Sequence, residues 1–265
     1  WPSGRPGNGS RSDGTDGTLD VIAQFEKETG IEVNYTTYPT NEEMYNKLKT
    51  GGVSYDLVIP SDYMIGRMIK EDMLAKLNFD NIPNYSLIDD KYKSGDAAAH
   101  DPTCEYSVPY SSGRVGLVYN PEYITEEVDS WDILWDEKYK GNILMFDNPR
   151  DAFGIAQLSL GLSLNTEDKA ELQKAADKLK AQKSVNPVYA MDQIMEKMPN
   201  EEAYVAPYYV GDCLTMYNDA IEYDTELKVV IPKEGTNLFV DAMCVPKTST
   251  HKTEAEQFIN FMLRT

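Results

Sequence analysis

The chain has 265 residues, of which 41% are apolar, a length that suits one large domain or two smaller ones. Its formal net charge is −19, from 44 acidic and 25 basic residues. This excess of acid argues against nucleic acid as a partner, because phosphate binding requires a basic surface, and it weakly favours cationic ligands. No run approaches the roughly 20 apolar residues of a membrane helix.

Cysteine and histidine are too sparse to indicate a metal or redox centre. The three cysteines, Cys104, Cys213 and Cys244, lie far apart and form no Cys-x-x-Cys motif, so their spacing favours neither a metal site nor a disulfide framework. We expect three buried thiols, with one disulfide left open. The two histidines, His100 and His251, lie in polar stretches and are expected at the surface. No cofactor and no metal ion are therefore expected.

Helical and extended patterns alternate along the first part of the chain. Residues 1–12 have the composition of a linker or leader. The elements predicted after it are a helix over 18–29, a strand over 31–38, a helix over 41–51 with Asn41 as its N-cap, a strand over 55–59, and a further helix. Strands separated by helices indicate a parallel sheet, and ligands bind beyond the carboxyl ends of such strands.

The second part of the chain continues the mixture of strands and helices. The predicted elements are two extended runs around a Ser-Ser-Gly corner within 106–120, a strand over 143–146, a helix from near Arg150 capped by Asp147 or Asn148, a charged surface helix over 166–183, an apolar run within 202–217, two short strands within 228–247, and an amphipathic helix over 254–264. The expected fold class is therefore α/β.

Aromatic rings, carboxylates and small polar groups recur where the predicted strands end. These corners are Ser61 with Tyr63, Asn148 with Asp151, Tyr209 with Asp212, and Phe239 with Asp241. Each alone is weak evidence, because an Asp in a turn usually caps a helix, but their recurrence suits an organic cation. A ring face attracts an ammonium group by about 0.5–2 kcal/mol, and a carboxylate near it adds up to about 4 kcal/mol.

Motifs of common enzyme classes are missing from the sequence. It contains no Gly-x-Ser-x-Gly, no phosphate-binding glycine-rich loop and no His-Glu-x-x-His. A carboxylate pair could hydrolyse glycosides, so an enzyme acting on a small substrate stays open as an alternative. The corner residues suit recognition better than proton transfer.

Three long segments resemble the spermidine/putrescine-binding proteins of bacterial ABC importers. They are "FEKETGIEVNYTTYPTNEEMYNKLKTGGVSYDLVIPSDYMIGRMIKEDML", "SWDILWDEKYKGNILMFDNPRDAFGIAQLSLG" and "VVIPKEGTNLFVDAMCVPK". The resemblance runs from about residue 17 to the last residue. It implies a two-lobed periplasmic-binding-protein fold of the second topological type, with a ligand cleft between lobes that close by a hinge motion.

The resemblance also implies where the lobes and the binding residues fall. Two crossovers are expected near 116–120 and 239–246, with lobe one over 13–117 plus 241–265 and lobe two over 118–240. The family's binding residues fall on Ser61, Tyr63, Asn148, Asp151, Tyr209, Asp212, Phe239 and Asp241. Asn148 stands where the family has an acid, whereas Tyr209 and Phe239 stand where it has tryptophans. The carboxylate of Asp241 is expected to bind an amine group of the ligand.

The family's biology gives the remaining expectations. The resemblance implies a monomeric, non-catalytic protein, in the periplasm or at the cell surface as a lipoprotein, which delivers spermidine or putrescine to the permease subunits of an ABC importer. Association with the membrane would be through the permease or a lipid anchor. Because residues 1–12 do not match the family and the family continues past residue 265, the chain is expected to be truncated or rebuilt at both ends. Two alternatives stay open: another small amine or organic cation as ligand, and a scaffold with impaired binding.

Overall fold

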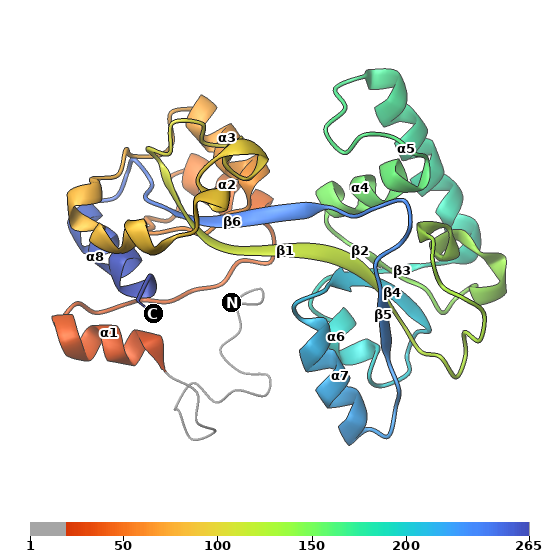
Figure 1. Ribbon diagram of the computed structural model, residues 1–265. Coiled ribbons are helices and arrows are strands. Elements are labelled where there is room, and N and C mark those ends of the chain that lie inside the picture. Colours follow the sequence, from red (N-terminus) through yellow and green to blue (C-terminus); the bar gives the residue numbers. More distant parts are fainter. Residues whose placement is uncertain (1–19, 265) are drawn as a thin grey trace. The chain divides into compact units, whose positions relative to one another are not determined.

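The chain forms two compact lobes. The computed structural model describes residues 20–264, so the predicted leader over 1–12 lies outside the described residues. Lobe one ends at Ser112 and resumes at Phe239, and lobe two is Gly113–Leu238. The chain passes from one lobe to the other within two strands, β1 (Ser107–Tyr119) and β6 (Leu238–Cys244), which pair with each other (Figure 1). The predicted α/β class is confirmed.

The helices of lobe one are α1 (Val21–Thr29), α2 (Asn41–Lys49), α3 (Asp62–Lys70) and α8 (Lys252–Met262), and polar side chains cap the first two of them. The α1 helix begins at Asp20, whose carboxylate accepts the Ala23 N–H, and ends at Gly30 in the left-handed conformation. The N-cap of α2 is Thr40 rather than the predicted Asn41. The side chain of Asn41 therefore takes no part in the cap.

The predicted parallel strands of lobe one are wrong. Residues 31–38 form no strand, and side chains hold this extended segment: the Val33 N–H donates to Glu26, and the Tyr38 hydroxyl donates to the Ile59 carbonyl. The predicted strand over 55–59 shrinks to an antiparallel bridge between Val58 and β6. Its hydrogen-bonding partner comes from far along the chain and runs the opposite way, which local periodicity does not reveal.

Lobe two contains two sheets, one built from β4 (Val205–Tyr209), part of β1 and β5 (Lys228–Val230), and the other from β2 (Leu144–Phe146) and β3 (Val188–Ala190). Strand β1 pairs antiparallel with both β4 and β5, and β2 pairs parallel with β3. Because β1 is one continuous strand, the predicted Ser-Ser-Gly corner is wrong. Gly116 permits the close approach of β5, since a Cβ there would lie 3.0 Å from the Val230 carbonyl oxygen.

The helices of lobe two are α4 (Pro149–Ser159), α5 (Lys169–Ala181), α6 (Ile194–Lys197) and α7 (Cys213–Glu222) (Figure 1). Asn148 caps α4 by accepting the Asp151 N–H, and Pro149 occupies its first turn, as the sequence predicts. Helix α5 buries only Ala175, which confirms the predicted surface helix. The 3-10 helices span Phe79–Asn81, Pro83–Leu87, Asp90–Tyr92, Gly95–Ala98, Trp131–Trp135, Glu137–Tyr139 and Gln182–Val185.

Strand β6 lies between two apolar clusters of lobe one. Ala242 and Cys244 pack with α2 and α3, whereas Met243 and Val245 pack with α8 residues such as Ile259. Alternate side chains of a strand point to opposite faces, so β6 supplies both clusters at once. Lobe two has one large core around β1, β2 and β4. Of the helices that the structure describes, none is long and apolar enough to cross a membrane.

The burial of the cysteine and histidine side chains differs in part from what the sequence predicts. All three cysteines are free, with Cys213 and Cys244 buried and Cys104 only half-buried. His251 is exposed as predicted. His100 is half-buried beside α3, because Gly66 allows its backbone to approach, and burial lowers the pKa of His100 below its usual value. The predicted surface position of His100 is therefore wrong.

Candidate functional site

A polar cluster surrounds Asp241 in lobe one. The residues of this lobe-one cluster are Asn41, Glu42, Ser61, Tyr63, Ser111, Phe239 and Asp241. The Ser61 hydroxyl donates to Asp241 Oδ1 at 2.7 Å, and the Ser111 hydroxyl donates to Oδ2 at 3.1 Å. Burial raises the pKa of Asp241 above its usual value, against the opposing effect of the two serine hydrogen bonds. The carboxylate is thus half-buried and held in place by neutral donors.

Backbone pairing brings Ser61 to Asp241, which is 180 residues away along the chain. The two residues form an antiparallel bridge, and the Ala242 N–H donates to the Pro60 carbonyl at 3.1 Å. Although Ser61 stands at the N-cap position of α3, its side chain makes no capping hydrogen bond. Its hydroxyl is directed instead to Asp241 and accepts from the Asn41 amide at 3.1 Å. The Ser61 side chain therefore helps to hold the Asp241 carboxylate and does not cap α3.

Two aromatic rings belong to the same cluster. The Tyr63 hydroxyl donates to Glu42 Oε1 at 3.0 Å. Phe239 is half-buried and lies two residues before Asp241 on β6, so both side chains leave the same face of the strand. Four of the predicted site residues thus lie around one corner of lobe one: Ser61, Tyr63, Phe239 and Asp241.

A second cluster surrounds Asp151 at the beginning of α4. The residues of this lobe-two cluster are Asn148, Asp151, Tyr209 and Asn237. Asp151 Oδ2 accepts the Asn148 amide at 2.6 Å and the Tyr209 hydroxyl at 2.9 Å. Its other oxygen accepts the Asn237 amide at 3.3 Å. The carboxylate is buried, with 8% of its residue surface exposed, and three neutral donors surround it.

Tyr209 and Asp212 flank the end of β4. The Tyr209 ring packs on Phe146 with centroids 5.2 Å apart, which keeps its hydroxyl directed at Asp151. Asp212 is buried at the beginning of α7, and burial raises the pKa of Asp212 to about 6. Its backbone N–H donates to the Tyr209 carbonyl at 3.0 Å. Among residues 20–264, no side chain hydrogen-bonds to its carboxylate, so Asp212 is not joined to the lobe-two cluster by such a bond.

Neutral groups hold the central carboxylates of both clusters. Within the described part of the chain, no lysine, arginine or histidine forms an ion pair with Asp151 or Asp241. Buried charges in proteins are normally paired. Each cluster can therefore accept a cation from outside, because its serine, tyrosine and amide groups orient the carboxylate without neutralising it.

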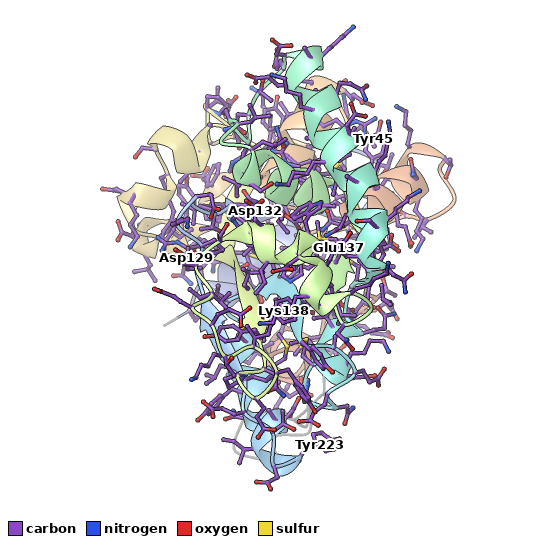
Figure 2. The ribbon with its side chains drawn as sticks, turned by 90° about the vertical axis from the view of Figure 1, so that its right-hand side faces the viewer. Tyr45, Asp129, Asp132, Glu137, Lys138 and Tyr223 are labelled. Carbon is purple, nitrogen blue, oxygen red and sulfur yellow. The ribbon has the colours of Figure 1, made fainter. Side chains whose placement is uncertain are left out.

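A cavity elsewhere on lobe two has different chemistry. It has a volume of about 340 Å³ and is lined by residues of the 126–136 segment. Asp129 and Asp132, which Figure 2 labels, belong to this segment. They pair with lysines, at 3.0 Å to Lys233 and 2.5 Å to Lys178. Because these carboxylates are already neutralised at an exposed surface, the cavity is not the candidate site. No group of three or more metal-ligating side chains occurs among the residues described.

The sequence analysis missed several cluster residues. Asn41 was interpreted as a helix cap and Ser111 as part of a turn, although both contact predicted site residues. Glu42 was interpreted only as an acid in the first turn of a helix, and Asn237 was not singled out. Two signals were available. One is a polar side chain close in sequence to a predicted site residue. The other is a polar side chain in the first turn of α2, where Thr40 already supplies the cap.

Comparison with known proteins places the chain in a family. The model of the bacterial extracellular solute-binding proteins matches residues 20–265. The chain belongs to this family. It is 35% identical over 246 residues to a spermidine/putrescine-binding periplasmic protein of Escherichia coli, covering 92% of this chain and 69% of that protein. The predicted family and the extracytoplasmic location are confirmed.

Solved structures of related solute-binding proteins share the fold. One is the substrate-binding protein of a spermidine/putrescine ABC transporter from Streptococcus pneumoniae, with a TM-score of 0.73 and 36% identity, covering 92% of this chain and 74% of that one. Another is a lipoprotein of Treponema pallidum, with a TM-score of 0.83 and 29% identity over 92% of this chain and 76% of that one. The predicted two-lobed periplasmic-binding-protein fold is confirmed.

Proposed function

We propose that this solute-binding protein captures a polyamine, spermidine or putrescine, and delivers it to the permease of an ABC importer. The eight residues predicted from the sequence are proposed to contact the ligand, and both clusters take part. The relatives whose names include spermidine and putrescine support this choice of ligand. The same fold can serve many ligands, so the proposal depends on the chemistry of the clusters.

The observation that carries the proposal is the Asp241 carboxylate. It is half-buried, oriented by two serine hydroxyls and free of an ion pair with any described residue. An ammonium group of the ligand would supply the missing positive charge and a charge-assisted hydrogen bond. Burial makes that attraction stronger than it would be in water.

Aromatic rings beside both carboxylates account for selectivity toward amines with carbon chains. Tyr63 and Phe239 lie beside Asp241, whereas Tyr209 lies beside Asp151. A ring face binds the methylene groups by apolar contact and an ammonium group by its quadrupole. Carboxylates would select charge, and the rings would select the spacer between charges.

The proposal includes the protein's partners and its lack of catalysis. The protein acts as a monomer, associates with the membrane through the permease or a lipid anchor, and releases its ligand unchanged. The carboxylates of both clusters are held by neutral donors, an arrangement that suits holding a cation. Incubation of spermidine with the protein, followed by mass spectrometry, should return intact spermidine; a product that accumulates with time would contradict this part.

Isothermal titration calorimetry with spermidine, putrescine and, as a neutral control, 1,4-butanediol tests the proposal. We expect saturable one-to-one binding of at least one polyamine and no binding of the diol. Folding is checked first by circular dichroism, so that absent heat reports on the site. A folded chain that binds neither polyamine would contradict the proposed function. Binding of only another small amine, such as cadaverine, would support the alternative ligand considered above.

A further inference from the structure

One member of the lobe-two cluster, Asn237, is not among the residues proposed to contact the ligand. Its side-chain amide donates to Asp151 Oδ1 at 3.3 Å. Asn237 is half-buried and lies one residue before β6 begins at Leu238. It reaches Asp151, in the first turn of α4, from 86 residues further along the chain. The contact is therefore a product of the tertiary fold of lobe two and not a local helix cap.

The two oxygens of the Asp151 carboxylate are occupied unequally. Oδ2 accepts the Asn148 amide at 2.6 Å and the Tyr209 hydroxyl at 2.9 Å. Among residues 20–264, Asn237 supplies the one side-chain hydrogen bond to Oδ1. Each oxygen of an ionised carboxylate offers about two lone-pair positions, so Oδ1 keeps one open whereas both positions of Oδ2 are used. The ammonium contact proposed for Asp151 therefore falls on the oxygen that Asn237 holds.

Hydrogen bonds to the rest of lobe two fix the segment that carries Asn237. Trp131, which is fully buried, donates its ring N–H to the Gly235 carbonyl at 2.9 Å. The Thr236 hydroxyl donates to the Val115 carbonyl on β1. Neither contact involves the carboxylate, so the position of the segment does not depend on it. A donor supported in this way can orient a binding group without being rearranged itself.

We propose that Asn237 is a positioning residue that fixes Asp151 Oδ1 for an ammonium group of the polyamine. The inference rests on the proposed polyamine binding and adds to it the residue that orients one of its contacts. Without the Asn237 amide, Oδ1 has no donor to hold it and can turn about the Cβ–Cγ bond of Asp151. The ligand must then order that oxygen as it binds, and affinity falls because the site is no longer pre-organised.

Calorimetric titration with spermidine and putrescine tests the inference in a double-mutant cycle. Asn237→Ala removes the donor, and Asn237→Leu removes it while filling a similar volume. We expect both to lower the affinity of each polyamine that the wild-type protein binds, by roughly three- to ten-fold. In an Asp151→Asn background the same substitutions should change affinity by less than about two-fold, because the group that they orient has lost its charge.

The matched control is Asn218→Ala, which truncates an exposed asparagine of α7 in the same lobe and should change affinity by less than about two-fold. Each variant is first shown to be folded by circular dichroism. Equal losses with and without Asp151→Asn would overturn the inference, because Asn237 would not act through Asp151. A loss in the alanine variant that leucine restores would mean that Asn237 only fills space.

The direction of the change is a further check on the inference. If Asn237 competed with the ligand for Oδ1, its removal would raise the affinity, and unchanged or tighter binding in Asn237→Ala would therefore contradict the positioning role. Titration of the wild-type protein separates this failure from failure of the proposed function. A wild-type chain that binds neither polyamine overturns both, whereas wild-type binding that Asn237→Ala leaves intact overturns the inference alone.

Discussion

Asp241→Asn should weaken polyamine binding while leaving the unliganded protein equally stable or more stable. Two unit charges about 4 Å apart attract by up to about 4 kcal/mol at an effective dielectric constant near 20. Part of this is lost because the ligand leaves water, so we expect a net cost of about 2–3 kcal/mol, a loss in affinity of roughly 30- to 150-fold. Ser61 and Ser111 can rotate their hydroxyls to bond the asparagine, so the local geometry is kept.

The stability half of this prediction follows from the raised pKa of Asp241. A carboxyl group whose pKa is higher in the folded protein than in the unfolded chain destabilises the fold when it is ionised at neutral pH. Asparagine removes that cost, so thermal unfolding of the unliganded variant at pH 7.5 should occur at the same or a higher temperature. Calorimetric titration gives the affinity, with Asp80→Asn, an exposed acid of the same lobe, as the control. Unchanged affinity in Asp241→Asn would refute the reasoning.

Three further predictions concern pH and folding. Polyamine affinity should fall between pH 7.5 and 5, because burial raises the pKa of Asp212 to about 6 and its protonation removes negative charge; titrations that show no pH dependence would count against Asp212 as a ligand contact. The pKa of Asp212 is about 6, against a usual value of 3.8, so its contribution to the free energy of unfolding declines as pH rises from about 4 to about 6. Asp212→Asn should therefore stabilise the protein above pH 6 by about 1–2 kcal/mol after allowance for solvent screening, and urea denaturation at pH 4 and 7 checks whether the gain is confined to the higher pH. Asn148→Ala should lower the free energy of unfolding by about 1–2 kcal/mol, since it removes the α4 cap and a donor to Asp151. Asn148→Ser keeps a capping oxygen and should recover about half of that loss. An equal loss of stability in both variants would exclude the cap as its cause.

Local signals in the sequence predicted six of the eight α-helices that the structure describes and missed α6 and α7. Asn148 before Pro149 and Gly30 after a periodic segment are cap residues whose preferences come from the backbone itself. They therefore act in the same way whatever the rest of the chain does. At α2 the cap shifts from Asn41 to Thr40, two neighbouring residues that can both accept a hydrogen bond.

Strand pairing could not be predicted in the same way. The Val58 segment meets a strand that lies 186 residues later, at Cys244, and runs antiparallel to it. Alternation of apolar residues shows that a segment is extended but not which strand it meets or in which direction. The same limit explains why β1 was predicted as two runs, because its partner strands β4, β5 and β6 lie far along the chain and no local pattern contains those pairings.

The candidate site was accessible from the sequence mainly through family resemblance. Aromatic-acid corners indicated cation binding in general, but the pairing of Ser61 with Asp241 joins distant segments. Glu42, Asn41 and Asn237 were missed because each has an ordinary explanation in its own segment, as a helix or loop residue. Only the folded chain shows that they contact residues already assigned to the clusters.

Calorimetric titration of the folded wild-type chain with spermidine and with putrescine, at low and at moderate salt, tests the central claim most directly. The account predicts saturable one-to-one binding of at least one of the two amines, with affinity that falls as salt screens the carboxylates. No binding of either amine to a chain shown to be folded would contradict the proposed polyamine capture.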